Sequence, residues 1–87
     1  MNIKEQAKKD YKEFLTIIEG MEDITIENLK KNFKVLDKGF FYFISYKSIQ
    51  VSTIIKDGYL DFYRTVYLIG DNYISTFEDE DRKYLIK

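Results

Sequence analysis

The sequence predicts a small α+β protein, in which two N-terminal helices pack on one face of a four- to five-stranded antiparallel meander sheet. As far as Phe33, apolar residues recur at steps of three and four, which is typical of one side of a helix. From Phe40 onward the period changes to two, which is typical of strands. The dipeptide Asp57-Gly58 lies between two such runs and is favoured in two-residue hairpin turns.

The first helix is expected to begin after Asn2, whose side chain can cap the first turn. Glu5 follows three residues later, as in a capping box, and Gly20 is placed to end the helix. Lysines fill much of the polar side. The apolar stripe consists of Ile3, Ala7, Tyr11, Phe14, Leu15 and Ile18.

A second, shorter helix is expected after Thr25, a favourable N-cap residue. Ile24 and Leu29 stand at the two positions of a hydrophobic staple, which supports this start. Phe33 continues the apolar side, and the segment 37–39 (Asp-Lys-Gly) is the expected turn out of the helix.

The remaining chain reads as strands at 40–46, 49–56, 59–69 and 73–77, with 83–86 as either a last edge strand or a helical turn. Lys47-Ser48 is the expected loop between the first two strands. A single domain, 1–87, then divides into a helical part at 1–38 and an antiparallel sheet at 39–87.

The hairpin loop predicts which side chains of the two longest strands share a face. A regular register directs four pairs toward the helices: Ile55 with Leu60, Thr53 with Phe62, Val51 with Arg64, and Ile49 with Val66. The other face receives Lys56 with Tyr59, Ile54 with Asp61, Ser52 with Tyr63, and Gln50 with Thr65. In the strand before them, Phe40, Tyr42, Ile44 and Tyr46 would face the helices, and Phe41 and Phe43 the other side.

The composition indicates a cytoplasmic protein. There is no cysteine, so no disulfide holds the fold and nothing indicates an oxidising compartment. The N-terminal residues lack the apolar segment of a signal peptide, and no apolar run approaches the roughly 20 residues of a membrane span. With 14 basic and 15 acidic residues, no field of one sign would steer the chain to nucleic acid.

The side chains that usually carry catalysis are missing. The chain has no histidine and no cysteine, and therefore lacks the commonest general acid–base, the most readily activated nucleophile and the usual zinc ligands. Its four glycines are explained by turns and caps rather than by a phosphate-binding loop. The neighbouring Lys47 and Ser48 fit a turn better than a catalytic dyad. We therefore expect no enzyme activity, no cofactor and no metal.

Two features are candidate partner-binding surfaces. The first is an aromatic face, since Tyr is common at protein interfaces and Tyr59, Tyr63 and Tyr67 recur at even spacing. The alternative is that the C-terminal segment or a helix covers this face. The second is a run of acidic residues, for which a solvated loop is the alternative. The candidate residues are Tyr59, Asp61, Tyr63, Tyr67, Phe41 and Phe43 on the face, and Glu78, Asp79, Glu80 and Asp81 in the run.

In general character the chain is similar to small proteins of phages and mobile elements, although the similarity covers no specific residues. Many such proteins, anti-CRISPR proteins among them, block a host machine by direct binding. The first hypothesis is therefore a non-catalytic inhibitor, in the host cytosol, that occludes a larger nuclease or defence complex. The alternatives are an antitoxin- or immunity-type or homodimeric interaction module, and a single-strand nucleic-acid binder, for which the aromatic face offers one basic residue, Lys56.

Overall fold

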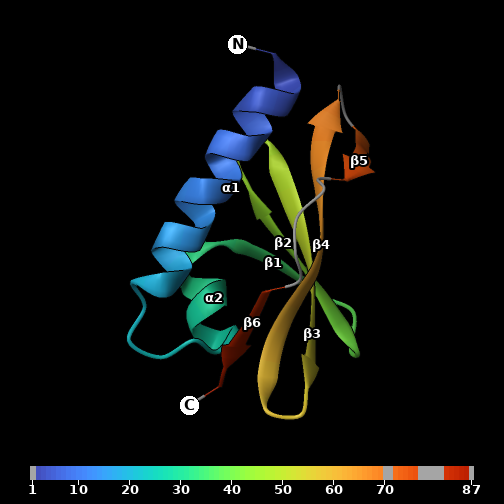
Figure 1. Cartoon of the computed structure of the whole chain (residues 1–87). Coiled ribbons are helices and arrows are strands. Elements are labelled where there is room, and N and C mark those ends of the chain that lie inside the picture. The colour runs from blue at the N-terminus through green and yellow to red at the C-terminus, as the bar shows by residue number, and fades with distance from the viewer. Residues whose placement is uncertain (1, 70–71, 77–81, 87) are drawn as a thin grey trace.

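The computed structural model describes residues 2–69, 72–76 and 82–86, and it confirms the predicted α+β fold class. Two helices precede all the strands, and they lie together on one side of the sheet (Figure 1). The helices are α1 (Ile3–Glu19) and α2 (Ile26–Asn32), and the strands are β1 (Lys34–Asp37), β2 (Phe41–Tyr46), β3 (Ile49–Lys56), β4 (Tyr59–Ile69), β5 (Asn72–Thr76) and β6 (Arg82–Leu85).

Both helices begin at the predicted caps. The Asn2 side chain accepts a hydrogen bond from the backbone N–H of Glu5 at 2.8 Å, and the Thr25 hydroxyl accepts one from Asn28 at 3.1 Å. Each bond satisfies a backbone donor that the first helical turn leaves unpaired. Helix α1 ends at its C-cap, Gly20, as expected.

The described strands form one antiparallel sheet in the order β1-β2-β3-β4-β5, and β6 returns to pair with β4. Strands β5 and β6 share one edge of β4. Strand β5 pairs with the C-terminal end of β4, where Ile69 lies opposite Asn72. Strand β6 pairs with the N-terminal end of β4, where Tyr59 lies opposite Leu85. Of the two conformations expected for residues 83–86, the strand is therefore the observed one.

Strand β1 was not predicted, because residues 34–37 were assigned to the helical part. Helix α2 stops earlier, since its C-cap Phe33 is extended at φ −138° and ψ 162°. The following residues pair with β2, which places Val35 opposite the buried Ile44 and against the core. This addition makes β2 an interior strand, a position that suits its apolar residues on both faces.

The hairpin of β3 and β4 matches the predicted register only near its turn. Asp57 and Gly58 both have positive φ, at 53° and 80°, as a type I′ turn requires. Thr53 lies opposite Phe62 as expected, but the register then shifts, and Ser52 lies opposite Arg64. Tyr63 is thus the extra residue of a β-bulge, and every side chain beyond it changes face.

The bulge corrects four face assignments. The regular register directed Arg64 toward the helices opposite Val51, where its charge would be desolvated without a partner. In the structure Thr65 takes that position and is buried, and Tyr67 lies opposite the buried Ile49. Val66 moves to the other face, opposite Gln50.

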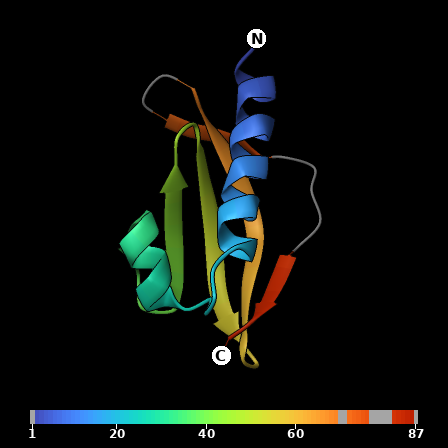
Figure 2. The same cartoon turned by 90° about the vertical axis from the view of Figure 1, so that its left-hand side faces the viewer.

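The core lies between α1 and the inner face of the sheet, and Figure 2 shows α1 crossing in front of the strands. Phe14 is its centre, because the ring centroid of this fully buried residue is 4.9 Å from that of Phe33 and 5.6 Å from that of Phe62. Phe40, predicted to face the helices, precedes β2 and is 85% exposed. The contacts of Phe14 with Phe33 and Phe62 pack both helices against the sheet.

We expect Phe14→Ala to lower the free energy of unfolding by about 3–5 kcal/mol, because it opens a cavity at the centre of the core. Phe40→Ala makes the same chemical change at an exposed site and should shift it by less than about 0.5 kcal/mol. Urea unfolding followed by circular dichroism measures both. Equal losses in the two variants would contradict the assignment of Phe14 to the core.

Candidate functional site

The helices cover one face of the sheet, and the other, which we call the open face, carries a patterned set of side chains. Strand pairing places these side chains in rows that run across the sheet. The rows are Lys34, Ser45, Gln50 and Val66; then Leu36, Phe43, Ser52 and Arg64; then Phe41, Ile54, Asp61 and Lys83; and last Lys56, Tyr59 and Leu85. Ser52 and Val66 belong to these rows but are buried.

The middle of this face is apolar. Phe41 and Phe43 pack edge to face, with ring centroids 5.2 Å apart and planes at 75°. Leu36 lies opposite Phe43 and is 49% exposed, and Ile54 lies opposite Phe41. These four residues, which we call the apolar centre, join three adjacent strands into one patch that no described helix covers.

Three further side chains extend the patch across β4 and β6. Tyr59 and Tyr63 are 42% and 41% exposed, and Leu85 is 57% exposed. Tyr63 owes its position to the bulge, where it has no counterpart in β3. Aromatic side chains held on a strand lose little conformational entropy on binding, which is why they are frequent contact residues.

Basic side chains surround the apolar centre. The rows of the open face contain four basic side chains and one acidic side chain, that of Asp61. Arg64 reaches this face through the bulge, and Lys34 and Lys83 are contributed by β1 and β6. The basic rim consists of Lys34, Lys56, Arg64 and Lys83.

Asp61 lies within the rim, opposite Ile54 on one side and Lys83 on the other. Its Oδ1 atom is buried and has no hydrogen-bond partner among the described residues. A hollow of about 260 Å³ opens here, lined by Lys56, Asp57, Tyr59, Asp61 and Lys83.

The predicted site residues are only partly brought together. Tyr59, Asp61, Phe41 and Phe43 lie on the open face as predicted, and Tyr63 lies at its bulge. The face predicted for Tyr67 was wrong, because this side chain packs against the core on the helix side. The acidic run of Glu78, Asp79, Glu80 and Asp81 lies outside the described residues.

Sequence reasoning missed several residues of the face. Leu36 and Lys34 belong to the strand that was assigned to the helical part. The regular register placed Arg64 in the core, where a lone arginine facing Val51 and Phe62 would be desolvated. This unfavourable placement was the signal in the sequence that the register is irregular. An irregularity in β4 is the simplest way to move Arg64 to solvent.

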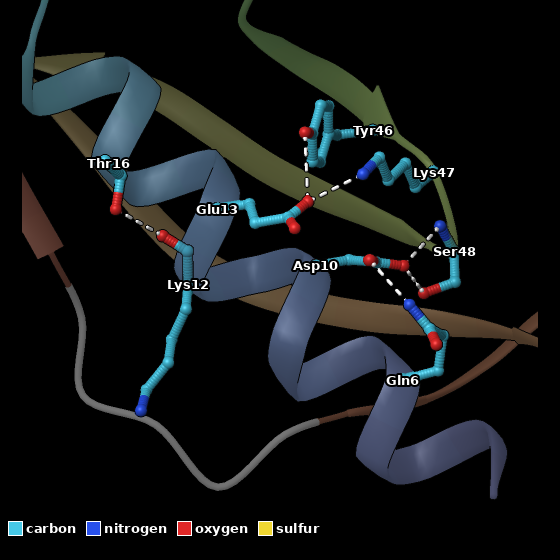
Figure 3. Close-up of polar contacts among 8 residues, drawn as sticks. All are labelled: Gln6, Asp10, Lys12, Glu13, Thr16, Tyr46, Lys47 and Ser48. Atoms are coloured by element: carbon cyan, nitrogen blue, oxygen red, sulfur yellow. Dashed lines mark hydrogen bonds and ion pairs between the residues drawn. The ribbon is translucent and has the colours of Figure 1, made fainter. Parts of the chain in front are cut away.

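A second polar cluster joins α1 to the loop between β2 and β3 (Figure 3). Asp10 is only 1% exposed, and its carboxylate accepts hydrogen bonds from the Ser48 hydroxyl at 2.5 Å, the Ser48 N–H at 3.3 Å and the Gln6 amide at 2.9 Å. Glu13 accepts bonds from the Lys47 ammonium at 2.7 Å and the Tyr46 hydroxyl at 3.3 Å.

These contacts explain how a carboxylate can be buried here. Burial alone would raise the pKa of Asp10, but the hydrogen bonds from Ser48 and Gln6, with the charge of Lys47, outweigh it and hold the pKa below its ordinary value. Lys47 adopts φ 48°, and its ammonium pairs with Glu13 while the Ser48 hydroxyl pairs with Asp10. The two neighbours therefore bind separate carboxylates, and the cluster positions a hairpin.

The described residues contain no group of three acidic, histidine or cysteine side chains that could hold a metal ion. Among them no helix is long and apolar enough to cross a membrane. Comparison with known proteins finds no matching family model, no matching curated protein and no matching solved structure.

We expect Asp10→Asn to lower the free energy of unfolding at pH 7 by about 1–3 kcal/mol, because a buried charged acceptor is lost. The folded-state pKa of Asp10 lies below its ordinary 3.8, so its contribution is fully present above that value and is lost as pH falls through the folded pKa. The difference between wild type and variant should accordingly shrink on going from pH 7 to about pH 3.

Urea unfolding across this pH range measures the effect. Asp57→Asn, at an exposed turn position that suits asparagine, is the matched control and should change stability little at any pH. A loss in Asp10→Asn that is the same at both pH values would contradict the proposed role of the carboxylate.

Proposed function

We propose that this chain is a non-catalytic protein-binding domain that docks on a larger protein through its open face and inhibits it by covering the bound surface. The observation that supports the proposal most directly is the apolar centre. Leu36, Phe41, Phe43 and Ile54 form a contiguous apolar patch on a sheet face that the described helices leave bare.

The patch has the composition of a protein interface. Such interfaces combine an apolar middle, rich in aromatic residues and depleted of charge, with a polar rim that excludes water. Here the middle holds two phenylalanines, Tyr59 and Tyr63 flank it, and charged residues lie outside it. Leu36 is exposed and Phe41, Phe43 and Ile54 are half-buried. Large contiguous apolar patches on monomeric proteins are often binding sites.

The face is also held in a fixed shape before binding. It belongs to paired strands, and the strand hairpin beneath it is tied to α1 by Asp10 and Glu13. A preformed face loses little conformational entropy when it docks, so a small patch can still bind firmly. This suits a protein that acts by occupancy, and the composition indicates that its host target is cytoplasmic.

A double variant of the open face, Leu36→Ala with Tyr63→Ala, tests the proposal. The partner is first recovered by affinity capture from host lysate, purified and titrated by calorimetry. We expect the dissociation constant to rise at least about tenfold, which corresponds to about 1.4 kcal/mol, because two exposed contact residues are truncated.

The matched control is Ile3→Ala with Ile17→Ala, which removes two exposed apolar side chains from α1. It should leave the affinity unchanged. Equal affinity of the open-face variant and wild type would show that the partner binds elsewhere.

A further inference from the structure

The charges around the apolar centre specify what kind of protein fits it. Of the five charged side chains in the rows of the open face, four are basic and Asp61 is acidic. This is not the balance of the whole chain, whose net charge is −1. We infer that the open face docks on a protein surface with an apolar middle and an acidic rim, and that it does not pair with a second copy of this chain.

This inference rests on the proposed function and deepens it. A rim of one sign gains most from a partner of the opposite sign, because complementary potentials raise the association rate and suppress wrong partners. Lys34 lies on β1 at one side of the apolar centre, and Arg64 and Lys83 lie on β4 and β6 at the opposite side. They therefore specify acidic groups on both sides of the partner's patch, rather than one acidic stripe.

The basic rim also disfavours docking of the open face on a second copy of this chain. A twofold pairing of open faces would bring together two rims that each carry four basic side chains and a single carboxylate, that of Asp61. Like charges brought together and desolvated cost several kcal/mol in interfaces. The apolar centre alone would have to offset that repulsion.

The arrangement also favours protein over single-stranded nucleic acid. Base stacking needs ring faces open to solvent. Tyr59 and Tyr63 are exposed, but Phe41 and Phe43 at the middle of the face are half-buried and pack against each other. Leu36 and Leu85 add exposed aliphatic surface, which offers bases no stacking partner. The basic residues surround a patch instead of following a line, as a phosphate backbone would require.

The experiment places a photo-crosslinking amino acid at Tyr63, expresses the full chain in host cells, and identifies the adducts by mass spectrometry. The expected adduct joins Tyr63 to another protein, at a surface where apolar residues are flanked by Asp or Glu. Affinity for that purified protein should fall steeply as salt is raised.

A charge-reversed variant, Lys34→Glu with Arg64→Glu and Lys83→Glu, should weaken binding to that protein at least about tenfold. The matched control reverses three exposed lysines of α1, Lys4→Glu with Lys8→Glu and Lys12→Glu. It makes the same change in net charge and should bind as wild type does. Urea unfolding of both variants checks that they fold.

The outcomes separate the two proposals. A protein adduct that is indifferent to salt and to rim reversal would overturn the acidic-partner inference and leave the protein-binding function standing. An adduct to a second copy of the chain, or tight binding of a labelled 20-nucleotide single strand, would overturn the inference in favour of that occupant. Absence of any adduct to another protein would overturn the proposed function itself.

Discussion

The register of β4 against β3 decides which side chains of this protein meet its own helices and which are left for a partner. Side chains alternate along a strand, so one extra residue exchanges the faces of all that follow. The bulge at Tyr63 sends Arg64 out and brings Thr65 and Tyr67 in. The core therefore does not bury the charge of Arg64, and the open face gains an arginine beside its apolar centre.

Strand β4 also pairs with more strands than any other described strand of the sheet. It pairs with β3 along one edge and with both β5 and β6 along the other, so it contacts strands from three parts of the chain. Leu60 and Phe62 on its inner side meet the core, and Tyr59 and Asp61 on its outer side lie on the open face. Core stability and the geometry of the proposed interface thus depend on the same strand.

Much of this fold follows from local chemistry that a sequence displays. The caps at Asn2 and Thr25 and the Asp57-Gly58 turn each act over three or four residues, and all three were predicted. What escaped prediction depends on contacts distant in sequence. Residues 34–37 become a strand because Val35 finds Ile44 in β2.

The candidate site was likewise predictable where it depends on local turns, and not where it depends on distant contacts. Tyr59, Phe41 and Phe43 lie close to turns whose geometry is local, and their faces were assigned correctly. Tyr67 lies beyond the bulge, and no local pattern marked that irregularity except the arginine it moves out of the core. Lys34 and Lys83 join the rim only because β1 and β6 pair into the sheet.

The pairing of Phe14 with Phe62 has a consequence for biosynthesis. The apolar stripe of α1 is made first, but the β4 ring that packs against it follows only after the intervening residues, which a ribosome adds at about 5–20 per second. For some seconds the nascent helix has no sheet to cover. During that interval chaperones and neighbouring chains can contact the apolar stripe of α1. The exposure ends only when β4 has been synthesised and can pack against the helix.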